Sequence, residues 1–231
     1  MGTHTTSKVK IMFRVTLRFI VLCISMFAVI FVSAGRWNYW QGWTYFLMWV
    51  AMQLINSFLL PLELIDERSQ IKAGTKKWDV LIYVIIALLS YIVPLIASLD
   101  GGRYHWTGKY PIWVNILAFS IILLDSIVFV YSMQVNRFFS ATVRIQKDRD
   151  QYVIDKGPYS FVRHPGYSSM LISYVLAGFA MNSKWALLPG CVMAAVFIIR
   201  TKLEDVTLQN ELPGYKEYAS RVKYRLFPGI W

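Results

Sequence analysis

The chain has 231 residues, of which 56% are hydrophobic and 16% are charged, and its net charge is +11. A soluble domain of this size carries about 25% charged residues, and the apolar residues here come in long runs, so a polytopic membrane protein is indicated. The basic residues flank those runs, so membrane topology and anionic lipid account for them, and no nucleic-acid partner is expected. Cys23 and Cys191 lie within apolar runs, so neither a disulfide nor a metal site is predicted.

The apolar segments predict an all-α, polytopic helical bundle of about six membrane spans. They cover residues 11–34, 39–61, 79–99, 111–135, 167–182 and 184–203. The first four are long enough to cross roughly 30 Å of hydrocarbon as helices, and the last two, separated by residues 182–184, indicate a short helical hairpin. We therefore expect an N-terminal region of four spans (1–135) and a second region (136–231) with the hairpin and a cytoplasmic C-terminal segment.

The first apolar segment has two interpretations. Basic residues, then Phe19–Val32, then the small residues Ser33 and Ala34 imitate a secretory signal with its cleavage site. The preceding Ile11 and Phe13 lengthen the apolar stretch and favour a retained helix. Whether this span is retained or cleaved stays open at this stage.

The distribution of basic residues predicts the topology. Of the 24 Lys and Arg residues, all but Arg36, Arg103, Lys109 and Lys184 flank the spans on one side, Lys8 and Lys10 among them. By the positive-inside rule both termini and every long polar loop are cytoplasmic. The C-terminal residues 229–231 carry no retention signal, which favours a prokaryotic cell membrane.

Polar residues gather where the fifth apolar segment begins. The loop 136–166 is either a solvated connector or a folded binding loop, and long loops are often functional. After it comes Arg163-His164-Pro165-Gly166-Tyr167. Pro165 suits the first helical turn, so His164 lies at a helix N-terminus that attracts anions, and Gly166 leaves room for a ligand. Alternatively, Arg163 only anchors the helix at lipid headgroups and His164 only caps it.

A second polar pair follows the hairpin. Arg200 and Glu204 are four residues apart, so they share one helix face. They are either a site or an interfacial ion pair. Tyr215, Tyr218 and Val222 recur at helical spacing and predict an amphipathic helix that packs against the site.

Asp125 lies inside the fourth apolar segment. An acid within the membrane is a functional candidate by default, and a buried hydrogen bond to a neighbouring span is equally possible. We therefore leave Asp125 outside the predicted site, with its role open.

These motifs occur together in an order that resembles a known family. Across residues 134–231 the chain carries Gly157-Pro158-Tyr159, Arg163–Tyr167, the hairpin, Arg200-x-x-x-Glu204, Gly214-x-x-x-Tyr218 and Arg225-x-x-Pro228. This arrangement closely resembles the isoprenylcysteine carboxyl methyltransferases, which are integral membrane enzymes that use S-adenosylmethionine. No Gly-x-Gly-x-x-Gly pattern is present, so a Rossmann cofactor domain is not expected.

The resemblance implies roles for individual residues. The cofactor would bind in a cytoplasmic pocket built from the 136–166 loop and the C-terminal helix, and a strand-like segment 151–154 would contact it. The implied cofactor-binding residues are Gln146, Gln151, Tyr152, Val153, Ile154, Tyr159, His164, Pro165, Gly166, Tyr167 and Glu204. Arg163 and His164 would suit the cofactor's carboxylate, and Arg200 would be catalytic by meeting the substrate.

The implied reaction is carboxyl O-methylation of an isoprenylcysteine or a similar lipidic carboxylate. The acceptor would be lipidic or prenylated and would enter from the membrane, beside membrane lipid. Thr201-Lys202-Leu203 replaces the acidic run of the eukaryotic enzymes, so methylation of a phospholipid amine or a small thiol remains an alternative. A non-catalytic membrane protein is a further alternative, and the oligomeric state is open.

Overall fold

A computed structural model describes the backbone of residues 2–231 and the side chains of residues 12–231. Lys8, Lys10 and Ile11, used above for topology and for the first span, lie outside the described side chains. The described chain is all-helical, with eight α-helices and no strand, which confirms the predicted fold class. The helices are α1 (Gly2–Ala34), α2 (Trp40–Leu59), α3 (Leu62–Ser69), α4 (Lys77–Ala97), α5 (Ile112–Val135), α6 (Pro165–Ala180), α7 (Leu187–Glu211) and α8 (Tyr215–Arg221).

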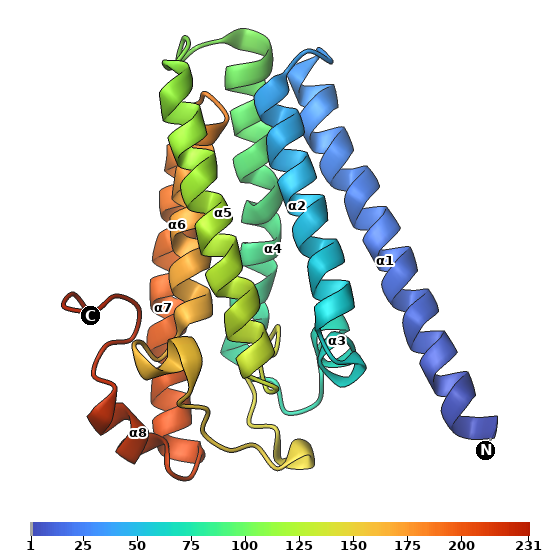
Figure 1. Ribbon diagram of the computed structural model, residues 1–231, viewed down its shortest axis with the longest axis vertical. Coiled ribbons are helices and arrows are strands. Elements are labelled where there is room, and N and C mark those ends of the chain that lie inside the picture. Colours follow the sequence, from blue (N-terminus) through green and yellow to red (C-terminus); the bar gives the residue numbers. More distant parts are fainter. Residues whose placement is uncertain (1) are drawn as a thin grey trace.

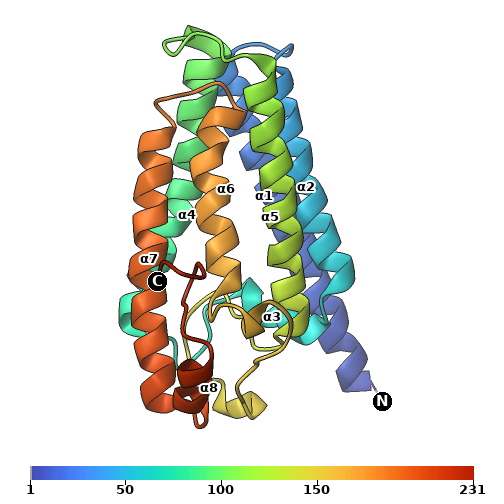
Figure 2. The ribbon, with the colours of Figure 1, turned by 60° about the vertical axis from the view of Figure 1, so that its left-hand side comes forward.

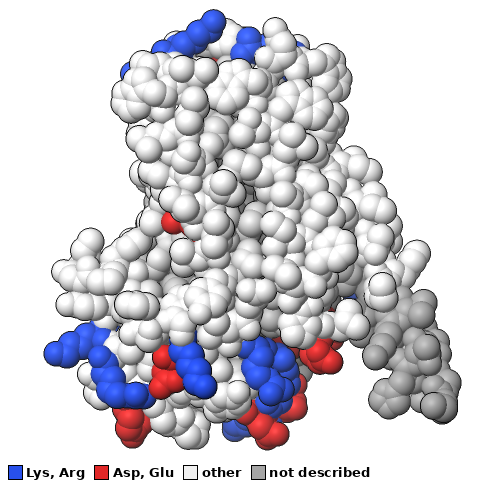
Figure 3. Space-filling model, viewed as in Figure 1, with Lys and Arg blue, Asp and Glu red and all other residues white. Residues whose placement is uncertain are grey.

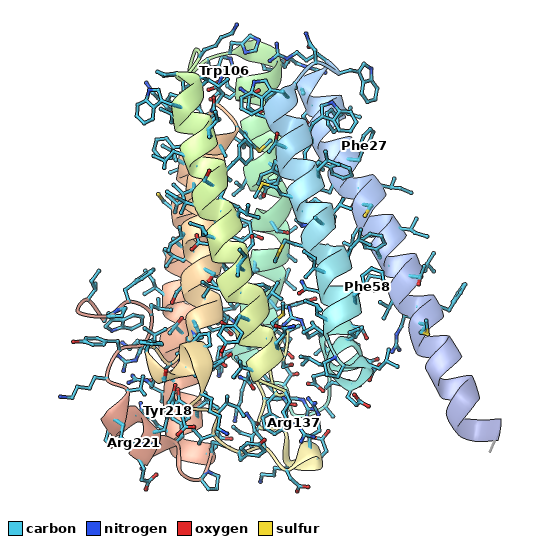
Figure 4. The ribbon with its side chains drawn as sticks, viewed as in Figure 1. Phe27, Phe58, Trp106, Arg137, Tyr218 and Arg221 are labelled. Atoms are coloured by element: carbon cyan, nitrogen blue, oxygen red, sulfur yellow. The ribbon has the colours of Figure 1, made fainter. Side chains whose placement is uncertain are left out.

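The long helices run side by side and define two ends of the molecule (Figures 1 and 2). We call the end that carries α3, α8 and the 136–164 segment the charged end, because most Lys, Arg, Asp and Glu side chains gather there (Figure 3). A nearly uncharged band covers the middle of the bundle, and a few basic side chains mark the opposite end. Arg137 and Arg221 lie at the charged end, and Trp106 lies at the other (Figure 4).

Three helices are long and apolar enough to cross a bilayer. They are Met12–Ala34, Ile112–Val135 and Lys77–Tyr104, the last comprising α4 and the π-helix Ser98–Tyr104 that continues it. Phe58 of α2 is 84% exposed, as suits a side chain in contact with lipid. The chain is thus a membrane protein. The number of six spans stays a prediction, because α6 has only 16 residues.

The predicted hairpin is present, but its second helix is longer than expected. The turn between α6 and α7 passes through Asn182 in a left-handed conformation, with φ of 64°. α7 continues to Glu211 instead of ending near residue 203. The apolar run stops there, but nothing in residues 204–211 breaks a helix. Glu204 and Asp205 therefore lie on the same rigid rod as Arg200.

Two local expectations meet different outcomes. Gln151–Ile154 belongs to neither a helix nor a strand in the described chain, so the strand-like assignment was wrong. The predicted amphipathic helix is present as α8. Its Tyr215 and Tyr218 are buried with Leu212 and pack against Val153, which fastens the C-terminal segment to the loop.

Candidate active site

The charged end contains a cleft of about 810 Å³ that is open to solvent. Its walls come from the 136–159 segment, the start of α6, the end of α7 and α8. Every residue implied for cofactor binding lines this cleft except Pro165; those that line it are Gln146, Gln151, Tyr152, Val153, Ile154, Tyr159, His164, Gly166, Tyr167 and Glu204. Arg200 is not among the lining residues.

The 136–166 segment is a folded loop, not a solvated connector. Arg144 is buried and forms a two-pronged ion pair with Glu67 of α3, at 2.8 Å from each of its oxygens. Burial alone would raise the pKa of Glu67, but the hydrogen bonds and charge of Arg144 hold it below its ordinary value. The Val143 amide donates to the carboxylate of Asp79 in α4. These contacts tie the loop to two helices.

Gln146 and Tyr159 shape the cleft from inside the loop. The Gln146 side chain donates to the Phe138 carbonyl at 2.7 Å and accepts from Arg149 at 2.6 Å. The Tyr159 hydroxyl accepts a hydrogen bond from Asn136 at 3.1 Å. Both polar groups are thus bonded within the protein, so their positions next to a ligand would be fixed beforehand.

The start of α6 is positioned by the C-terminal segment. Pro165 is the first residue of the helix, as predicted. The amides of Arg163 and His164 each donate at 2.9 Å, to the carbonyls of Tyr224 and Arg225 respectively. This pairing explains how residues near the C-terminus contribute to the site without lining it.

The space beside Gly166 is filled by protein. We expected this glycine to leave room for a ligand, but an added Cβ would lie 2.6 Å from Cζ of the Phe139 ring. Phe139 lines the cleft, and Gly166 is small so that this ring can approach the helix. In the direction of a Cβ the glycine therefore accommodates an aromatic side chain, while Gly166 also lines the cleft, and its contact with a ligand stays a prediction.

Asp205 is the centre of a buried ionic network that sequence reasoning missed. Its carboxylate is fully buried and is bound by Arg163 at 2.7 Å and by Arg225 at 2.8 Å, with Nε2 of His164 at 3.5 Å. Burial alone would raise its pKa, but hydrogen bonds from His164, Arg163 and Arg225 hold the pKa far below the ordinary range. Arg163 is therefore paired within the protein, and the idea that it binds a ligand carboxylate was wrong.

No sequence signal identified Asp205, because its partner Arg163 is 42 positions away. On the helical wheel Asp205 points away from the face shared by Arg200 and Glu204. That direction turns out to be the interior.

Arg200 and Glu204 do not pair with each other. Arg200 forms a two-pronged ion pair with the fully buried Asp79, at 2.8 and 2.9 Å, and also donates to the carbonyl of Ala141. Its guanidinium lies 5.3 Å from the centroid of the Tyr167 ring. The interfacial ion pair between Arg200 and Glu204 that was considered above is therefore absent. Arg200 does not line the cleft itself but packs on Tyr167, which does.

Glu204 is the half-buried acid of the cleft. It accepts a hydrogen bond from the Tyr167 hydroxyl, and the Tyr167 ring stacks with that of His164 at 5.7 Å between centroids. Among the side chains that the structure describes, no basic group lies within 4 Å of the Glu204 carboxylate. The cleft thus offers an uncompensated negative charge next to aromatic rings.

These features fit S-adenosylmethionine. A free carboxylate favours the cationic sulfonium or ammonium group, and aromatic walls such as Phe138 and Tyr152, whose rings meet edge to face at 5.1 Å, suit a purine. No group of three or more metal-ligating side chains occurs within the described residues. Cys23 and Cys191 are both free thiols.

Asp125 of α5 faces a second cavity, between α2, α5 and α6. Its Oδ2 atom is buried, and no hydrogen-bond partner for it occurs in the described part of the chain. The expected alternative, a buried hydrogen bond to a neighbouring span, is not seen for this oxygen.

Comparisons with known proteins agree with the resemblance. Residues 113–210 match the model of the isoprenylcysteine carboxyl methyltransferase (ICMT) family. Protein-S-isoprenylcysteine O-methyltransferase B of Arabidopsis thaliana is 26% identical over 142 residues, which cover 60% of this chain and 68% of the relative. Cobalt-zinc-cadmium resistance protein CzcN of Cupriavidus metallidurans is 32% identical over 133 residues, 55% of this chain and 56% of that protein. Residues 113–210 of this chain are thus similar to the isoprenylcysteine carboxyl methyltransferase family.

Proposed function

We propose that this chain is a membrane methyltransferase that binds S-adenosylmethionine in the cleft at the charged end and O-methylates the carboxylate of a lipidic acceptor. The family supports the reaction class, and the observation that carries the cofactor assignment is Glu204, a cleft carboxylate with no basic partner among the described side chains. The two relatives bear names that differ in function, so the acceptor must be argued from the site.

The chain's own residues would act by positioning and by excluding water. Glu204 would hold a cationic group of the cofactor, and the N-terminus of α6 beside His164 would face an anionic group. When bound, S-adenosylmethionine supplies an electrophilic methyl group: an acceptor oxygen forms the new C–O bond while the S–CH₃ electron pair stays on sulfur. No proton is transferred to or from a carboxylate acceptor, so no general base is required.

Arg200 would support this step indirectly. It packs on the Tyr167 ring, and the Tyr167 hydroxyl donates to Glu204. Asp79 fixes the guanidinium, so Arg200 would hold the tyrosine and thereby the carboxylate in place. Alignment of donor and acceptor can provide much of the acceleration in such a transfer.

We also propose that the charged end faces the cytoplasm. It carries the long polar segments and most of the basic residues (Figure 3), as the positive-inside rule requires. A water-soluble cofactor would then reach the cleft directly, while a lipidic acceptor would arrive from the bilayer.

The test is cofactor binding by purified protein in nanodiscs. Loss of a charge-assisted contact in Glu204→Gln should weaken S-adenosylmethionine binding by about 10- to 100-fold, and His164→Ala should also weaken it. The matched control is Glu211→Gln, on the same helix but in an exposed pair with Lys76, where the change should be within about twofold. Unchanged cofactor binding in both Glu204→Gln and His164→Ala would refute the site.

The acceptor is tested by transfer of a labelled methyl group to a farnesylcysteine analogue, an ethanolamine phospholipid and a small thiol. We expect the carboxylate of the farnesylcysteine analogue to be methylated. Transfer to the phospholipid or the thiol alone would keep the methyltransferase and reject the proposed acceptor.

A further inference from the structure

The cavity between α2, α5 and α6 lies next to the cleft. Its empty space, including the part open to the outside, is about 1040 Å³. The walls are largely apolar, although Asp125 also lines them; the apolar and aromatic residues include Tyr45, Trp49, Phe119, Ile122, Met170 and Tyr174. Phe129 lines this cavity and packs edge to face on Phe139, at 5.7 Å between centroids, while Phe139 lines the cleft. This pair of aromatic rings therefore lies between the two spaces.

Arg68 of α3 lies at that partition. It lines the cavity and also a neighbouring one between α1, α2 and α3. Its guanidinium carbon is 5.1 Å from the centroid of the Phe139 ring. Only its Nη1 atom makes hydrogen bonds within the described protein, and these are long, at 3.3 Å to the Phe139 carbonyl and 3.5 Å to that of Ser140.

The charge of Arg68 has no carboxylate partner in the part of the chain whose side chains are described. Among the described side chains no carboxylate lies within 4 Å of its guanidinium, and its acidic neighbours Asp66 and Glu67 are paired with other basic side chains. Burial lowers the pKa of Arg68 to about 10, so the group is still charged at neutral pH. The side chain is half-buried, and a cation that is partly removed from water attracts a ligand oxyanion more strongly than one on the open surface.

Arg200, the other arginine near the partition, is occupied. Asp79 binds two of its nitrogens and Ala141 accepts a further hydrogen bond. A carboxylate arriving at Arg200 would have to displace a fully buried ion pair. A carboxylate arriving at Arg68 would find Nε and Nη2 available for a two-pronged contact.

We propose that Arg68 binds the carboxylate of the methyl acceptor, with the acceptor's apolar part in the cavity between α2, α5 and α6. This inference rests on the proposed function and assigns its substrate-binding residue. The acceptor's carboxylate would then lie beside Phe139, at the boundary with the cofactor cleft. A lipid phosphate shares the same oxyanion chemistry, so the experiment must separate the two sources.

The decisive measurement compares two ligands of equal shape. The carboxylate of an N-acetyl-S-farnesylcysteine is assayed as substrate, and its carboxamide, which lacks the charge, as a competitive inhibitor. In Arg68→Gln the KM for the carboxylate should rise by about 10- to 100-fold, while Ki for the carboxamide changes by less than about threefold. Arg68→Lys keeps the positive charge but loses the planar guanidinium that can bind a carboxylate through two nitrogens. Its KM for the carboxylate should therefore lie between that of the unaltered protein and that of Arg68→Gln.

The matched control is Arg18→Gln. Arg18 of α1 also lines the cavity between α1, α2 and α3, is also without a carboxylate partner among the described side chains, and does not line the cavity proposed for the acceptor. Its KM should stay within about threefold of that of the unaltered protein. The affinity for S-adenosylmethionine, measured separately, should be unchanged in all three variants.

Three results would overturn the inference. They are an unchanged carboxylate KM in Arg68→Gln, a parallel loss of carboxylate and carboxamide binding, and an effect of Arg68→Gln that appears only in nanodiscs containing phosphatidylglycerol and not in pure phosphatidylcholine. The last would assign Arg68 to an anionic lipid headgroup, because phosphatidylcholine carries a phosphate but no net charge. If the unaltered protein binds S-adenosylmethionine but methylates no carboxylate, the proposed acceptor fails together with Arg68, whereas loss of the Arg68 effect alone leaves the proposed function standing.

Discussion

Replacing Asp205 by Asn should destabilise the protein more than any change in an exposed charge. The carboxylate is fully buried and binds Arg163, itself 6% exposed, through two nitrogens, as well as Arg225. Removal of one partner of a buried ion pair typically costs about 3–5 kcal/mol, because the other charge stays buried and uncompensated. We expect a loss of that size in the free energy of unfolding.

The assay is reversible unfolding in mixed micelles, with Asp155→Asn as the matched control. Asp155 pairs with Arg221, and the two side chains are 39% and 67% exposed, so the control should lose no more than about 1 kcal/mol. Arg163→Met combined with Asp205→Asn should lose less than the sum of the two single variants. A loss of less than about 1 kcal/mol in Asp205→Asn would refute the buried network.

The same variant has a defined pH dependence. The network holds the pKa of Asp205 in the folded protein below its unfolded value, which is about 3.9. A group with a depressed folded-state pKa stabilises the fold above its unfolded pKa, and this stabilisation is lost as the pH falls through the folded-state pKa. The deficit of Asp205→Asn should therefore be constant between about pH 8 and 5 and should shrink below about pH 4.

Two further changes test the walls of the two cavities. In Gly166→Ala the new methyl group would meet Phe139 at 2.6 Å, so we expect the free energy of unfolding to fall by about 1–3 kcal/mol. Adding Phe139→Leu to this variant should restore part of the loss. Equal stability of Gly166→Ala and the unaltered protein would contradict this packing. Asp125→Leu removes a buried oxygen that has no hydrogen-bond partner among the described residues. The free energy of unfolding of the detergent-solubilised protein should therefore rise by about 1 kcal/mol or more. A fall in the free energy of unfolding would mean that the carboxyl group has a partner.

Much of the architecture could be predicted from local patterns. The apolar runs predicted the all-helical class and the hairpin, because a backbone within a bilayer must bond internally. Pro165 predicted where α6 begins, since proline fits the first helical turn. The motifs also indicated which residues share the cleft, although their roles at a ligand remain predictions.

Only the tertiary structure decided which charges are paired. Arg163 was expected to face a ligand, but Asp205 binds it; Arg200 was expected beside Glu204, but Asp79 of α4 holds it. Arg68, to which the sequence assigned no role beyond topology, is a half-buried cation beside the second cavity, with no carboxylate partner among the described side chains. Helical spacing predicts which residues are neighbours on one helix. The energy of a buried charge depends instead on groups from other parts of the chain, here separated in sequence by 42 residues for Arg163 and Asp205 and by 121 residues for Arg200 and Asp79.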